Sequence, residues 1–184
     1  MSLNAINSLT IKTMDEWKDA FGWAPDSAAN KLDKAMLRWI KELTSCLEIW
    51  FNKGDSMTDG ELILARANMG SLVECWLKFF YCIYCDDYYN NPKVNKNGVI
   101  IEPNNMKLET LKVFSRGILW NTGDDWDKWI EKAQLQRNAI HAFNFRDIGV
   151  SADYLFDIIQ YYDFIKLIVE RLPDSPVSAY GEVY

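Results

Sequence analysis

The sequence is poor in the residue types from which metal sites and disulfide frameworks are built. It holds a single histidine and four cysteines among 184 residues. Structural zinc sites usually need four Cys or His ligands, with a turn between paired cysteines. Here Cys82 and Cys85 continue an apolar stretch that also follows Cys75, and no second pair or nearby histidine completes a tetrahedron. We therefore expect buried, reduced cysteines, no metal site and no cofactor.

Long hydrophobic runs and an export signal are also lacking. The longest uncharged apolar run, FFYCIYC at 79–85, is far shorter than the roughly 20 residues that span a bilayer. The N-terminal stretch MSLNAINSLT has no basic start followed by an apolar segment, so no secretory signal is expected. Cysteines without an export signal indicate a reducing compartment. The sequence thus predicts a cytoplasmic protein with no membrane contact.

Basic residues are outnumbered, with 20 Lys and Arg against 26 Asp and Glu and a formal net charge of −6. This balance argues against broad, nonspecific affinity for nucleic acid, although it leaves room for a small local basic site. The sequence also has no glycine-rich phosphate loop, GxSxG elbow, HExxH motif or EF-hand loop. These absences exclude the commonest nucleotide hydrolases, serine hydrolases, zinc proteases and calcium sensors.

Apolar residues spaced three and four apart are abundant, and they indicate helices. The expected helices cover 26–52, 59 to about 85, 106–118, a segment from Thr122 through the QRNAIHAF stretch at 136–143, and 151–172. Thr58 and Glu61 form a capping-box pattern before the second of them. We predict an all-α, multi-helix up-and-down bundle that forms a single domain over residues 1–184, with a loose tail at 174–184.

The loop-like segment at 89–105 separates the second and third of these helices. Its VII stretch at 99–101 is expected to be extended, with no obvious pairing partner. Just before it, DDYYNN at 86–91 combines acids with aromatics. That composition occurs in binding rims, but a frayed, solvated helix end is the favoured interpretation.

The octapeptide QRNAIHAF contains the lone histidine, His141, four residues after Arg137. On an α-helix this spacing places both side chains on one face. An arginine holds phosphate, and a histidine exchanges protons near neutral pH, so the pair suits metal-free cleavage of a phosphodiester. Asn138 would position the phosphate or the other side chains. The structural alternative is that Arg137 pairs with a carboxylate and His141 is only a helix residue.

Three stretches resemble the HEPN superfamily (higher eukaryotes and prokaryotes nucleotide-binding domains): LARANMGSLVECWLKFFYCIY at 64–84, QRNAIHAFNFRDIG at 136–149 and YYDFIKLIVERLP at 161–173. The resemblance covers most of residues 60–173. Many HEPN proteins are metal-independent ribonucleases of toxin–antitoxin, phage-defence and RNA-processing systems, with arginine and histidine at a cleft between two domains of a dimer. Others lack the activity and serve as binding modules.

The resemblance implies a bacterial defence-type or toxin–antitoxin-type endoribonuclease with Arg137, Asn138 and His141 as catalytic residues. It also implies a homodimer, with RNA or a nucleotide and an antitoxin or other protein as partners. Trp126 and Trp129, just upstream, are expected either at the dimer contact or in the core. The family commonly has four to six residues between arginine and histidine, whereas three intervene here. An inactive HEPN-like module that binds a nucleotide or a protein therefore stays open as the alternative.

Overall fold

The computed structural model describes residues 3–175, and these residues form an all-α bundle, as predicted. The tail expected at 174–184 lies outside the described residues except for its first two positions. The α-helices are α1 (Leu3–Trp17), α2 (Asp26–Asp33), α3 (Leu37–Ser45), α4 (Leu47–Lys53), α5 (Asp59–Ile83), α6 (Cys85–Asn90), α7 (Leu108–Ser115), α8 (Asp125–Arg137) and α9 (Ser151–Val169). Short 3-10 turns are η1 (Gly54–Ser56), η2 (Pro103–Asn105) and η3 (Asn138–His141).

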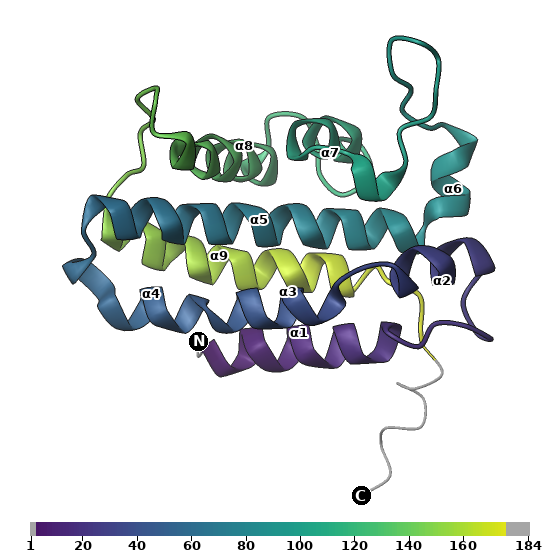
Figure 1. Ribbon diagram of the computed structural model, residues 1–184, viewed down its shortest axis with the longest axis horizontal. Helices are drawn as coiled ribbons and strands as arrows, with labels where there is room; N and C mark the ends of the chain where they lie inside the picture. Colours follow the sequence, from purple (N-terminus) through teal and green to yellow (C-terminus); the bar gives the residue numbers. More distant parts are fainter. Residues whose placement is uncertain (1–2, 176–184) are drawn as a thin grey trace, which may run out of the picture.

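The long helix α5 is the centre of the bundle. In Figure 1, α7 and α8 lie above α5, whereas α3, α4 and α1 lie below α5 and α9. The predicted capping box is confirmed, since the Thr58 N–H donates to Glu61 Oε2 (2.9 Å) and the Glu61 N–H donates to Thr58 Oγ1 (3.4 Å). The two bonds satisfy backbone donors that a helix start leaves open.

Aromatic side chains join α5, α8 and α9 in the core. Trp76 of α5 is fully buried, and its Nε1–H donates to the hydroxyl of Tyr161 of α9 at 2.9 Å. Trp126 and Trp129 of α8 both contact the ring of Phe164, with centroids 6.1 and 5.6 Å away. Trp129 is therefore buried in the core, which was one of its two expected positions, and Trp126 is half-buried against the core. A dimer contact through the exposed part of Trp126 stays a prediction.

The expected single helix over 26–52 is wrong, because three helices occupy this region. The chain turns at 34–36 between α2 and α3, and α4 follows α3 after Cys46. The turn allows α2 to pack on α5 and α6 while α3 packs on α1. Met36 and Trp39, two of the apolar residues spaced at helical intervals in this segment, are 59% and 55% exposed as a result.

The boundaries of the next segments also differ from the predicted ones. The 99–101 stretch does pair, through an isolated antiparallel bridge between Val94 and Ile100. The helix expected over 106–118 is shorter, because the backbone of Arg116 is extended after α7. The helix expected from Thr122 begins at Asp125, and the side chain of Asp124 caps it by accepting the Asp127 N–H at 2.9 Å.

The cysteines form no disulfide, as predicted, and all four lie among the described residues. Burial raises the pKa of the Cys82 thiol to about 12, so this thiol stays protonated and unreactive at neutral pH. Between residues 3 and 175, no helix is long and apolar enough to span a bilayer.

Candidate functional site

The α-helix ends inside the octapeptide, at Arg137, and the predicted continuation through His141 is wrong. Residues Asn138–His141 form the 3-10 turn η3, and Ala142 then takes a left-handed conformation with φ 51°. A 3-10 turn advances about 120° per residue, so two positions four apart differ by roughly a third of a turn. Arg137 and His141 therefore do not share one α-helical face.

Arg137 lies against α5 because Gly70 leaves room for it. A Cβ on Gly70 would be 2.5 Å from the Cβ of Arg137, a separation that real side chains do not adopt. Across this close approach, the guanidinium of Arg137 donates from Nη1 to Glu74, one turn further along α5. The alternative in which Arg137 pairs with a carboxylate is thus the one observed.

Glu74 is shared between two cations. Its Oε1 accepts from Nζ of Lys78 at 2.7 Å, while its Oε2 accepts from Arg137. Two positive charges around one carboxylate leave a small basic spot on an acidic chain. The neighbouring Cys75 is not a nucleophile in this spot, because burial raises the pKa of its thiol despite the nearby cations.

His141 and Asn138 are less constrained than Arg137. The imidazole of His141 is exposed, and Asn138 is half-buried. Within residues 3–175, neither side chain makes a hydrogen bond or an ion pair. The three predicted site residues are consequently close in sequence but play different parts in the structure, with only Arg137 held in place. No group of His, Cys, Asp or Glu in the same range is arranged to hold a metal ion.

The segment that follows His141 projects from the bundle and carries two phenylalanines. Phe143 and Phe145 are 95% and 92% exposed, which is unusual for aromatic side chains. The segment is the loop between α8 and α9 that rises at the upper left of Figure 1. Contiguous exposed apolar patches on folded proteins are typical of interaction surfaces.

The far end of this loop is anchored to a buried arginine. Nε of Arg66 in α5 donates to the carbonyl of Ile148 at 3.1 Å. The next residue, Gly149, has φ +66°, and a Cβ there would lie 2.9 Å from Oδ2 of Asp153. The loop is therefore anchored where it enters α9.

Arg66 forms an ion pair with Asp157 of α9, and the two side chains are 2% and 4% exposed. Asp157 also accepts from Nε1 of Trp129 at 3.0 Å and from Nζ of Lys132 at 2.8 Å. The cluster joins α5, α8 and α9, and its residues line a small pocket together with Gly70, which Arg137 contacts. The sequence analysis did not predict this cluster. An arginine within the apolar stripe of α5 and an aspartate within that of α9 were the signals that could have indicated a buried ion pair.

The arrangement offers two surfaces, a small basic spot at Arg137 and an apolar loop tip. The chain matches no protein-family model, no curated protein and no solved structure.

Proposed function

We propose that this chain is a HEPN-like, non-catalytic interaction module whose loop tip binds a second copy of the chain. The observation that carries the proposal is the almost complete exposure of Phe143 and Phe145. Further exposed apolar side chains occur in the same stretch of sequence, at Ile140, Val150, Phe156 and Ile159. Aromatic side chains that become buried on association supply much of the energy of protein interfaces.

The chain carries both a projecting loop tip and an exposed apolar face on α9, and this combination favours a second copy as the partner. Phe156 and Ile159 lie on one exposed face of α9, near the point where the loop joins this helix. In a twofold dimer each contact occurs twice, so the phenylalanines of one protomer can cover α9 of the other and receive the same cover in return. The acidic net charge argues against nucleic acid as the main occupant.

The double variant Phe143→Ser/Phe145→Ser tests this proposal. We expect the wild-type chain to dimerise and the variant to raise the dissociation constant by about thirtyfold or more, the effect of losing one interface hot spot. Light scattering after size exclusion, over a range of protein concentrations, measures it. Phe21→Ser is the matched control, because Phe21 is also exposed but lies far from the loop in the sequence. A wild-type chain that stays monomeric at high concentration would refute the proposal.

A second candidate function is metal-independent RNA cleavage by Arg137, Asn138 and His141. It is supported by the free, exposed imidazole of His141 and by the positive charge that Arg137 and Lys78 place around Glu74. In this mechanism His141 accepts the proton of a 2′-hydroxyl, and the 2′-oxygen attacks the adjacent phosphorus as the bond from phosphorus to the 5′-oxygen breaks. The 5′-oxygen leaves as a hydroxyl with a proton from water, while Arg137 neutralises the phosphate and Asn138 positions it. A site that draws Arg137 from one protomer and His141 from the other would overcome the different directions of these side chains.

RNA cleavage in EDTA tests the second candidate. If the chemistry operates, the products carry 2′,3′-cyclic phosphates, DNA is not cut, and His141→Ala lowers the rate by about a hundredfold or more. His141→Ala should leave the thermal midpoint unchanged because the ring is exposed. Arg137→Lys should also be inactive, because a point charge does not replace the planar guanidinium. If a broad RNA panel stays intact at concentrations where the chain is dimeric, the nuclease candidate is wrong and the binding module remains.

A further inference from the structure

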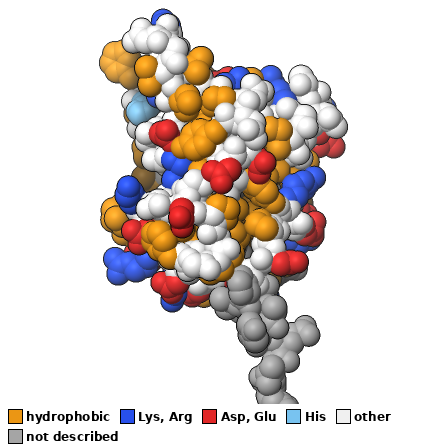
Figure 2. Space-filling model, turned by 90° about the vertical axis from the view of Figure 1, so that its right-hand side faces the viewer, with side chains coloured by type: hydrophobic (Ala, Val, Ile, Leu, Met, Phe, Trp, Pro, Cys, Tyr) orange, Lys and Arg blue, Asp and Glu red, His pale blue; other side chains and the backbone are white. Residues whose placement is uncertain are grey.

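A cavity of about 640 Å³ lies between the C-terminal part of α5, α6 and α7. Along α5, this is the opposite end of the bundle from the loop between α8 and α9, called here the Phe143 loop. The volume of the cavity falls within the range of small-molecule sites, roughly 300–1,000 Å³. Figure 2 views this end of the molecule and shows hydrophobic side chains gathered among acidic and basic ones. The cavity uses part of the DDYYNN stretch, which the sequence marks as either a binding rim or a frayed helix end.

Aromatic rings form the walls of the cavity. Phe114 of α7 lies 5.1 Å from Tyr81 and 5.2 Å from Tyr88, measured between ring centroids. Phe80 and Tyr84 continue the wall, with their centroids 4.9 Å apart. The five rings offer faces and edges on which a flat ring can pack in offset or edge-to-face contact.

The tyrosine hydroxyls are already engaged by the protein. Tyr81 donates to Oγ of Ser115 at 2.9 Å, and Tyr88 donates to the carbonyl of Ile101 at 2.6 Å. Tyr84 donates to the carbonyl of Arg171. Burial is the main cause that raises the pKa of Tyr84 and of Tyr88, so both stay neutral. The walls consequently present carbon surface, and the polar recognition must come from other residues.

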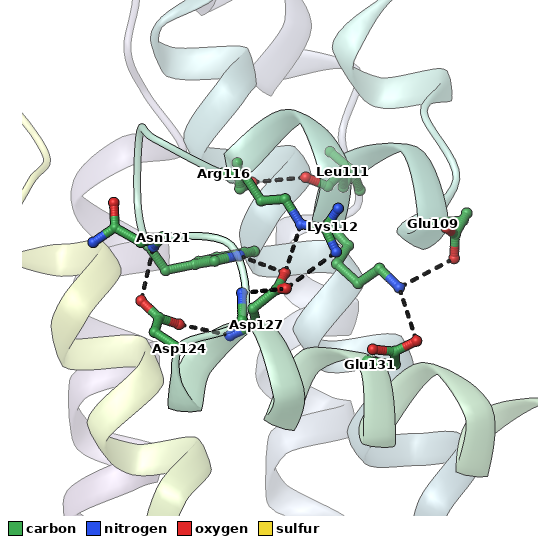
Figure 3. Close-up of polar contacts among 11 residues, drawn as sticks. Glu109, Leu111, Lys112, Arg116, Asn121, Asp124, Asp127 and Glu131 are labelled. Atoms are coloured by element: carbon green, nitrogen blue, oxygen red, sulfur yellow. Dashed lines mark hydrogen bonds and ion pairs between the residues drawn. The ribbon is translucent and has the colours of Figure 1, made fainter.

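Two cations border the cavity. Nζ of Lys93 lies 5.7 Å from the ring centroid of Phe114, and no carboxylate pairs with it within residues 3–175. Arg116 is held in place by Asp127, to which Nε and Nη2 donate at 2.8 and 3.1 Å, as Figure 3 shows. Arg116 lowers the pKa of Asp127, which keeps this pair ionised. Among the described residues, Nη1 of Arg116 makes no hydrogen bond.

We propose that this cavity binds a small planar aromatic molecule that carries a single negative charge, such as an aryl carboxylate. The ring packs on the wall around Phe114, and the anionic group lies near Lys93 and Nη1 of Arg116. Asp87 also borders the cavity, and its negative charge disfavours a dianion. The cavity shares no residue with the Phe143 loop, so this proposal does not depend on the proposed function.

Calorimetric titration of the full chain with 2-naphthoate tests the site. Lys93→Gln should weaken binding about fivefold, the usual scale of one solvent-exposed charge pair, whereas Asp87→Asn should tighten it by a similar or smaller factor. Lys96→Gln is the matched control, because Lys96 is in the same loop but does not line the cavity. Val113→Trp and Ile118→Trp each place a large ring at the cavity edge, where the native side chains are exposed, and should abolish binding while the circular dichroism spectrum is kept.

The competing probes are uncharged 2-naphthalenemethanol and dianionic 2-naphthyl phosphate. The proposal is supported if the alcohol and the phosphate each bind more weakly than 2-naphthoate. Equal binding of the alcohol would refute the charge recognition, and tighter binding of the phosphate would refute the preference for a single charge. If 2-naphthoate does not bind the wild-type chain at millimolar concentration, or if both tryptophan variants fold and bind as the wild type does, the cavity is not the site.

Discussion

Asp157→Ala is expected to lower the free energy of unfolding by about 3–5 kcal/mol, the usual cost of breaking a buried ion pair from one side. Asp157 neutralises Arg66, whose side chain is 2% exposed in the folded state. The substitution leaves that guanidinium charged and unpaired, and it also removes the acceptor of the Trp129 indole N–H. The anchor of the Phe143 loop depends on Arg66, so the loop should loosen as well.

Urea denaturation followed by tryptophan fluorescence measures this loss. Asp163→Ala is the matched control on the same helix, because Asp163 pairs with Lys166 at an exposed position, where ion pairs contribute about 0–1 kcal/mol. Arg66→Met/Asp157→Leu removes both buried charges and should be more stable than Asp157→Ala by about 2 kcal/mol. If Asp157→Ala and Asp163→Ala have equal midpoints, the buried pair does not hold α5, α8 and α9 together.

Gly70→Ala is expected to lower the free energy of unfolding by about 1–3 kcal/mol, although alanine is the better helix former by about 1 kcal/mol. The new Cβ would lie 2.5 Å from the Cβ of Arg137, an atom that a change of rotamer cannot move away. The end of α8 must therefore shift from α5, and the Arg137–Glu74 ion pair would be strained or lost. Any RNA-cleaving activity should fall along with stability.

Gly60→Ala is the control, because Gly60 lies in the same helix and a Cβ there meets nothing within 4 Å. It should be neutral or slightly stabilising, by at most about 1 kcal/mol. A double-mutant cycle with Arg137→Gly separates the clash from other effects, since the two substitutions should be less harmful together than their sum. Equal stabilities of Gly70→Ala and Gly60→Ala in thermal denaturation would show that α8 accommodates the methyl group without cost.

The candidate site was only partly predictable. Its residue types can be read from the sequence, whereas the positions of their side chains depend on contacts between residues far apart in the chain. Arg137, Asn138 and His141 stand out from residue type and spacing alone. The end of the α-helix at Arg137 has no glycine or proline signal in the octapeptide, so the pattern predicts a helix that continues. The chain leaves the helix where Gly70 brings α8 against α5, a contact between residues 67 positions apart.

The sequence by itself determined the all-α class, the start of α5 at its capping box and the apolar stripes that form the core. These features depend on neighbours within about one helical turn, so they can be predicted from the sequence. Only the tertiary structure decided that residues 26–52 divide into three helices and that Phe143 and Phe145 are exposed to solvent. The same holds for the two ion pairs, Arg137 with Glu74 and Arg66 with Asp157. Each of these outcomes depends on which helices pack together, since that packing determines which side chains are buried and which charges find a partner.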